Sequence, residues 1–251
     1  LPRRARDDPG EAATRIARRW VDILSARGGG GHVLRVDLRL RPSPEVTPIA
    51  LPVDAAISYY ESQALAWEQA AFIRARCAAG DRALGDAFLT AIRPFVWRSV
   101  RDYGQLRRIG DMSAKIRDHY DRGQQLGPGF DVKRGRGGIR EVEFFAQSQQ
   151  LIHGGRRPDL RAPRLRDALA ALSDADIVDT GLAARLYQHY ALLRTVEHRL
   201  QMIDDQQTHS LPLQPEALDR VAHLHGLADG TAMVALLRPT VDDVARQYDQ
   251  L

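Results

Sequence analysis

Asp37 is the one acidic residue in the stretch HVLRVDLRLRP, residues 32–42, where it alternates with arginines. A carboxylate is a hard oxygen ligand of the kind that Mg²⁺ prefers. The planar guanidinium group of an arginine is in general suited to bind two phosphate oxygens at once. One carboxylate does not make a metal site, because two-metal phosphoryl chemistry draws its ligands from several neighbouring elements. The alternative is structural: Asp37 pairs with a neighbouring arginine on a solvated surface.

The element that positions Asp37 is predicted to be a β-strand. Leu34, Val36, Leu38 and Leu40 alternate with the charged residues, and strict alternation is typical of a half-buried strand. Pro42 lacks a backbone N–H, so it ends the run. The remainder of the chain supplies no second pattern of this kind.

A second group of candidates lies in the stretch DVKRGRGGIREVEF, residues 131–144. Gly137 and Gly138 directly precede a predicted helix, and backbone N–H groups at a helix N-terminus attract anions. Lys133, Arg136 and Arg140 surround this turn, so a phosphate is a reasonable ligand. The alternative is a flexible loop whose glycines only allow a sharp entry into the helix.

The other polar groups do not predict a further site. Glu141 and Glu143 fall in the first turn of that helix, where acids complement the helix dipole, and they point in different directions. His198 and His209 are too far apart for a local metal motif. The run 204–207 is interpreted as the solvated end of a helix.

Composition excludes several classes of protein. The chain has 251 residues with a net charge of +4, and all but two of its 36 basic residues are arginine. The basic residues are interspersed with acids, so nucleic-acid binding is not indicated. Cys77 is the single cysteine, which rules out an internal disulfide and fits a reducing cytoplasm. Long apolar runs are absent, which argues against a membrane span.

The pattern of elements is almost entirely helical. A helix is expected over 11–26, followed by a glycine turn at 27–31, the strand, and a Pro-rich connection at 43–52. Amphipathic helices follow, among them one over 106–122. The segment 126–138 is the one long irregular stretch.

Four stretches together resemble a known family. They are VDLRLRP, AISYYESQALAWEQAAFIRARCAAGD, KRGRGGIREVEFFAQSQQLIHGGRRPDLR and LLRTVEHRLQMIDDQQTHSLP. In this order, between about residues 33 and 225, they are similar to the glutamine synthetase adenylyltransferase/adenylyl-removing enzymes. Four separated stretches in register are far more specific than any single glycine motif.

The resemblance implies a fold and an activity. Each half of such an enzyme has a nucleotidyltransferase domain, like that of DNA polymerase β, followed by a helical domain. We therefore expect a mainly α chain, with residues 1–44 as the helix-plus-strand remnant of the α/β nucleotidyltransferase domain and 45–251 as the helical domain. The wording GGIREVEF resembles the N-terminal half, which removes AMP from a glutamine synthetase tyrosine by phosphorolysis: phosphate enters and ADP leaves.

The resemblance also implies roles for residues. Asp37 matches the third catalytic carboxylate, a ligand of Mg²⁺, with Arg39 and Arg41 as phosphate contacts or tethers of Asp37. The Gly-Ser helix start and the Asp-x-Asp pair that precede this strand in the family are missing from the 251 residues. We therefore expect a fragment of a longer protein whose own metal site is incomplete.

The expected partners follow from the family: adenylylated glutamine synthetase, the PII signal protein, ATP or ADP, phosphate, and glutamine as an effector, in the cytoplasm. Two alternatives stay open. The chain belongs to the adenylylating, ATP-using half of the same enzyme, or it is a non-catalytic helical module that binds glutamine synthetase or PII.

Overall fold

The computed structural model describes residues 8–28, 31–32, 34, 36–98, 125–203 and 208–251. The chain divides into two compact units, Leu1–Val96 and Trp97–Leu251. The helix expected over 106–122 and the polar run 204–207 lie outside the described residues. The described part is mainly helical, as the sequence predicts, and it contains no helix that is both long and apolar enough to cross a membrane.

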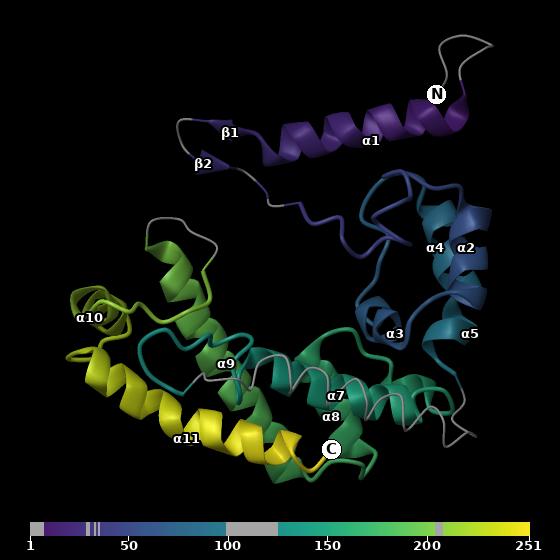
Figure 1. Ribbon diagram of the computed structural model, residues 1–251. Coiled ribbons are helices and arrows are strands. Elements are labelled where there is room, and N and C mark those ends of the chain that lie inside the picture. The colour runs from purple at the N-terminus through teal and green to yellow at the C-terminus, as the bar shows by residue number, and fades with distance from the viewer. Residues whose placement is uncertain (1–7, 29–30, 33, 35, 99–124, 204–207) are drawn as a thin grey trace. The chain divides into compact units, whose positions relative to one another are not determined.

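The first unit begins with α1 (Pro9–Ser25), which is coloured purple in Figure 1. Asp8 caps it by accepting a 2.7 Å hydrogen bond from the N–H of Gly10, and Pro9 occupies the first helical position, where no N–H is needed. Two-residue strands follow, β1 (Arg27–Gly28) and β2 (Gly31–His32), which pair antiparallel with Arg27 opposite His32 and Gly28 opposite Gly31.

The strand expected over 32–42 is not formed, and this part of the prediction is wrong. His32 belongs to β2, but the described residues 34 and 36–42 carry no strand. A strand is stabilised by backbone hydrogen bonds to a neighbour. Within the described residues, β1 and β2 pair only with each other, so the alternating segment has no partner. Its apolar face stays exposed, with Leu34 at 52% and Leu40 at 58%.

The first unit continues with four helices around an aromatic core: α2 (Val53–Ser62), α3 (Ala66–Phe72), α4 (Arg82–Ala91) and α5 (Arg93–Val96). Tyr60 lies at the centre, with its ring centroid 4.7 Å from that of Phe72 and 5.5 Å from that of Phe95. Asp81 caps α4 by accepting from the N–H of Leu84 at 3.0 Å, as is common for aspartate at a helix N-terminus. Packed rings of this kind fix the helices to one another.

The second unit contains the long helices labelled α7, α9 and α11 in Figure 1. Its elements are α7 (Ile139–His153), η1 (Pro158–Leu160), α8 (Leu165–Asp174), α9 (Thr180–Met202), α10 (Pro215–Leu224) and α11 (Gly230–Tyr248). Helix α7 packs against α8, α9 and α11. Two buried apolar clusters fill the interior, one around Leu193, Val196 and Val221 and the other around Val142, Leu169 and Leu186. The unit therefore has a core of its own.

Candidate functional site

Asp37 is held by Arg39 on the surface of the first unit. Arg39 donates from Nε to both carboxylate oxygens, at 2.9 and 3.0 Å, and from Nη2 to Oδ2 at 2.6 Å. The backbone N–H of Arg39 adds a 3.0 Å bond to Oδ1. These bonds lower the pKa of Asp37 to about 2, with the side-chain hydrogen bonds of Arg39 as the main cause. The carboxylate is therefore ionised throughout the neutral range.

Arg41 ties the chain to itself. Its guanidinium donates to the carbonyl oxygen of Leu38 at 2.7 Å and to that of Pro44 at 2.6 Å. The hydroxyl of Thr47 closes the same turn by donating to the carbonyl oxygen of Ser43 at 3.0 Å. Arg41 therefore stabilises the segment that follows Asp37, and its planar fork is used on two backbone carbonyls instead of two phosphate oxygens.

The Mg²⁺ site that the family resemblance implies is not formed by the described residues alone. They include no group of three or more His, Cys, Asp or Glu side chains that could hold a metal ion. Both oxygens of Asp37 already accept from Arg39. Mg²⁺ requires near-octahedral oxygen ligands, so Asp37 offers one of them at most, and only by exchange for the guanidinium.

The loop that carries Lys133 is fixed by a short ribbon in the second unit. The N–H of Gly129 donates to the carbonyl of Leu211 at 2.9 Å, and that of Val132 donates to His209 at 2.9 Å. Asp131 and Ser210 form the bridge between the two segments. The carboxylate of Asp131 also accepts from the N–H of Lys133 at 2.9 Å, as in an Asx turn. The segment that the sequence marks as irregular is thus well anchored.

The glycines of this loop are required by close packing. Gly137 has φ +73°, and a Cβ built there would lie 2.1 Å from the carbonyl oxygen of Val241 on α11. A Cβ on Gly138 would lie 2.7 Å from the carbonyl oxygen of Gly135. Both positions are buried. Loop and helix backbones can approach this closely only without side chains.

The backbone N–H groups at the start of α7 are used within the protein. That of Ile139 donates to Val132 at 3.0 Å, and that of Arg140 to Lys133 at 3.0 Å. The N–H of Gly137 donates to Glu141, a buried side chain, at 2.8 Å. An anion at this loop would therefore be held by cationic side chains and not by the loop amides.

The basic side chains of the loop do not gather in one place. Arg136 reaches the end of α11, where its Nη2 lies 2.6 Å from Oδ2 of Asp249. Lys133 turns the other way, toward α9, where its Nζ lies 3.3 Å from Oε1 of Glu197. Arg140 is exposed. Of the predicted phosphate contacts in this loop, Lys133 is the one that joins a buried charged cluster.

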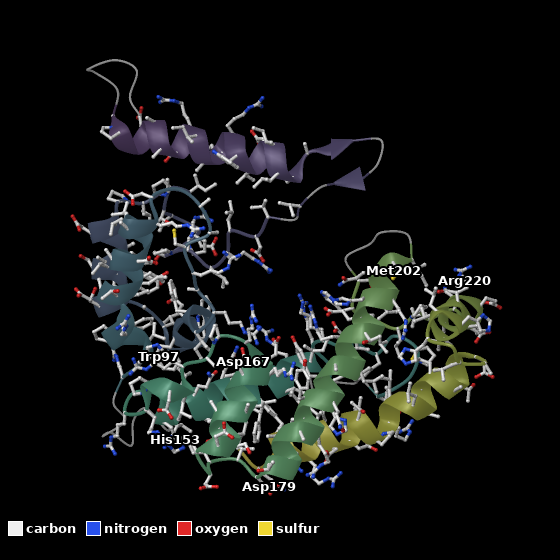
Figure 2. All side chains as sticks on the ribbon, turned by 180° about the vertical axis from the view of Figure 1, so that it is seen from behind. Trp97, His153, Asp167, Asp179, Met202 and Arg220 are labelled. Carbon is white, nitrogen blue, oxygen red and sulfur yellow. The ribbon has the colours of Figure 1, made fainter. Side chains whose placement is uncertain are left out.

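Glu197, which the sequence analysis did not single out, is the centre of that cluster. It lies near the Met202 end of α9, the helix between the labelled residues Asp179 and Met202 in Figure 2. Its side chain is 1% exposed. The guanidinium of Arg194, one turn earlier, donates to Oε2. Nδ1 of His209 lies 2.9 Å from Oε1. A buried carboxylate needs such partners, because removing its charge from water costs several kcal/mol. Attraction to nearby cations offsets a cost of about this size.

His209 is held in its uncharged form by these surroundings. Burial is the largest cause that lowers its pKa, and the ammonium of Lys133 adds to it. Glu197 acts in the opposite direction but is outweighed. Nδ1 of His209 and Oε1 of Glu197 lie 2.9 Å apart without the geometry of a hydrogen bond, so the contact is an electrostatic one between the ring and the carboxylate.

One sequence signal marks Glu197 in hindsight. Leu193, Val196, Glu197 and Leu200 follow the i, i+3, i+4, i+7 spacing of a helix face, and all four are buried. An acid within an apolar stripe predicts a buried, paired charge. The pattern identifies the acid but not Lys133 and His209, the two partners that come from other segments of the chain.

Comparison with known proteins gives matches on both units. The family model described as glutamate-ammonia ligase adenylyltransferase matches residues 3–91, and the one described as GlnD PII-uridylyltransferase matches residues 110–251. Curated relatives match nearly the whole chain. The chain is 47% identical over 251 residues to the bifunctional glutamine synthetase adenylyltransferase/adenylyl-removing enzyme of Caulobacter vibrioides and 45% identical over 246 residues to that of Rhizobium meliloti.

The chain belongs to the glutamine synthetase adenylyltransferase/adenylyl-removing family. The match covers all of this chain with the Caulobacter relative and 98% of it with the Rhizobium relative, but only 26% and 25% of those proteins. The chain thus spans about a quarter of the length of the adenylyltransferase relatives that it matches. The resemblance in the sequence is confirmed, and the helical second unit coincides with the longer of the two family-model matches.

Proposed function

We propose that the chain is part of a nucleotidyltransferase that controls glutamine synthetase by adding AMP to it and removing it. The observation that carries this proposal is the match of the entire chain, at 47% identity, to a relative named for both activities. We assign the chain to the adenylyl-removing half because the sequence of the stretch GGIREVEF resembles that of the N-terminal half in this family. In that reaction an oxygen of inorganic phosphate attacks the AMP phosphorus, the bond to the tyrosine oxygen breaks, and ADP and the free tyrosine hydroxyl are formed.

The residue roles are part of the proposal. Asp37 is proposed as one ligand of the divalent cation, Mg²⁺, whose remaining ligands would come from groups other than the described residues. Arg39 and Arg41 stay proposed phosphate contacts of the first unit. The domain boundary after residue 44 stays a prediction as well. Adenylylated glutamine synthetase, ATP or ADP, phosphate, the PII signal protein and glutamine are the proposed partners, on the family resemblance.

The test is an assay of ADP release from adenylylated glutamine synthetase with phosphate and Mg²⁺. It compares the polypeptide encoded by the complete gene with the same polypeptide carrying Asp37→Ala. Loss of ADP release in the variant supports Asp37 as a metal ligand. If the variant releases ADP at the unmodified rate, Asp37 is not a metal ligand and serves only in a structural ion pair. No release from either form, with AMP incorporation from ATP instead, favours the adenylylating half.

A second candidate is a helical module that binds glutamine synthetase or PII without chemistry of its own. The observation that favours it is that the second unit forms a closed core, built from two apolar clusters of its own residues. Binding of the 251-residue chain to either protein, with no ADP release and no AMP transfer by the polypeptide of the complete gene, would decide for this candidate.

A further inference from the structure

The cluster around Glu197 carries more positive charge than the buried carboxylate requires. Lys133 approaches Oε1 at 3.3 Å, and Arg194 donates to Oε2. Asp131 and Arg134, which also act on the pKa of His209, are opposite in sign. Among the described residues that contact Glu197, and with His209 uncharged, two cations face one anion, which leaves one positive charge. Excess charge of this kind beside a buried site attracts anions.

Lys133 and Arg194 are held in place both by their backbones and by the contacts of their side chains. The N–H of Lys133 donates to the carboxylate of Asp131 at 2.9 Å, and its carbonyl accepts from Arg140 at 3.0 Å, so both ends of this residue are fixed. Arg194 lies within the regular part of α9. Glu197 then places the ammonium group and the guanidinium group at its two oxygens. A preorganised pair of donors loses little entropy when a ligand binds.

Both cations also reach solvent. The side chain of Lys133 is 37% exposed and that of Arg194 is 34% exposed, whereas Glu197 is 1% exposed. An ammonium group has three donors and a guanidinium group has five. Within the described part of the chain, neither cation has a hydrogen-bond or ion-pair partner other than Glu197. Donors on both side chains are therefore left for a ligand that approaches from outside.

We propose that Lys133 and Arg194, positioned by Glu197, form a binding site for a phosphate group in the second unit. Lysine contributes a point charge and arginine a planar fork, a combination suited to the tetrahedral oxygens of phosphate. The phosphate belongs either to inorganic phosphate or to a nucleotide. A role of this site in phosphorolysis rests on the proposed function. The site itself is defined by the contacts of Lys133, Arg194 and Glu197.

The test is binding of inorganic phosphate, AMP and ADP to the 251-residue chain by isothermal titration calorimetry at constant ionic strength. Lys133→Gln and Arg194→Gln are each expected to weaken binding by about tenfold or more, because a hydrogen bond to a charged group is lost. Arg194→Lys keeps the charge and is expected to retain part of the affinity. Binding of phosphate alone identifies inorganic phosphate as the ligand, and binding of the nucleotides alone identifies a nucleotide phosphate.

Arg185→Gln is the matched control. Arg185 lies on α9, as Arg194 does, and its side chain is half exposed. It forms an ion pair with a carboxylate, with its Nε 3.7 Å from Oδ2 of Asp243. Its loss is expected to leave phosphate binding unchanged. Circular dichroism and thermal unfolding establish that each variant is folded.

Three outcomes overturn the site: no binding of any phosphate ligand by the unmodified chain, equal affinity in the Lys133 and Arg194 variants, or the same loss with Arg185→Gln. Failure of the site is distinguishable from failure of the proposed function. Calorimetry tests the site, whereas ADP release from adenylylated glutamine synthetase tests the reaction. Phosphate binding that depends on Lys133 and Arg194 in a protein without ADP release would leave the site intact and remove the reaction.

Discussion

Oε1 of Glu197 and Nδ1 of His209 lie 2.9 Å apart in the interior of the second unit. The contact joins α9 to the segment that pairs with the loop carrying Lys133, so one carboxylate holds three parts of the unit together. The two atoms approach without the geometry of a hydrogen bond, and both are buried from solvent.

The first prediction is a loss of stability in mild acid. The pKa of His209 is lowered from its usual 6.5 in the folded chain by burial and by Lys133. The unfolded chain then binds a proton more readily than the folded chain, so the stability that the neutral imidazole provides is present above pH 6.5 and is lost as the pH falls through the lowered folded value. Urea denaturation at about pH 7.5 and about pH 5.5, on either side of this range, is expected to show a lower midpoint in acid.

His209→Asn is the matched variant for this effect, since asparagine keeps a donor near Glu197 but does not titrate. Its midpoint is expected to depend less on pH. Some dependence will remain, because burial and Arg157 also lower the pKa of His153. An equally steep dependence in His209→Asn would contradict the assignment of the effect to His209.

The second prediction concerns Glu197→Gln. The amide keeps one acceptor but turns a donor toward a cation, so the buried pairing is broken on one side. We expect the free energy of unfolding to fall by roughly 1–3 kcal/mol, less than for a fully buried pair because Lys133 and Arg194 can turn to solvent. Asp242→Asn, at an exposed position of α11, should stay within about 0.5 kcal/mol. Equal midpoints in urea for Glu197→Gln and the unmodified chain would contradict the prediction.

The helical class could be predicted because local signals agree with the packed structure. Asp81, a residue type favoured at helix N-termini, caps α4, and Gly28 pairs with Gly31 in the two-stranded ribbon. The apolar stripe of α9 is visible in the spacing of Leu193, Val196 and Leu200. Such signals depend on neighbours along the chain, which the sequence displays directly.

The strand and the Glu197 cluster could not be predicted in the same way, because both depend on distant partners. The alternation around Asp37 is a property of the sequence, but strand formation needs a neighbouring strand, which the described residues lack. Lys133 stands 64 positions before Glu197 in the sequence and meets it only through the packing of loop and helix. The glycine pattern was visible, but its reason, the approach of Gly137 to Val241, was not.

The third prediction is a low pKa for Asp37 that depends on Arg39. Carboxyl ¹³C NMR is expected to place the pKa of Asp37 at about 2 in the unmodified chain. In Arg39→Gln, which removes the main cause of the shift, the value should return toward 3.8. The contribution of the pair to stability is then present above pH 3.8 and is lost as the pH falls toward 2. A pKa near 3.8 in the unmodified chain would show that the pair does not persist in solution.

The fourth prediction compares alanine substitutions at three glycines of the second unit. The comparison separates the cost of backbone strain from the cost of steric overlap. Gly137 has a positive φ and no space for a Cβ, Gly226 has a positive φ of 78° and open space, and Gly127 has open space without a positive φ. We therefore expect Gly127→Ala to change the free energy of unfolding very little. Gly226→Ala should lower it by about 1–2 kcal/mol, the cost of a left-handed residue.

Gly137→Ala should lower the free energy of unfolding by roughly 2–5 kcal/mol, because overlap with a backbone atom adds to the cost of the left-handed conformation. The carbonyl oxygen of Val241, 2.1 Å from the built Cβ, belongs to a helix backbone and cannot rotate away as a side chain can. The loop itself must shift, and with it the ribbon that fixes Lys133. Urea denaturation orders the three variants, and ¹⁵N NMR shows whether the Lys133 amide moves in Gly137→Ala alone. If Gly137→Ala cost no more than Gly226→Ala, the close packing of this loop on α11 would not hold in solution, and the fixed position of Lys133 would lose its structural basis.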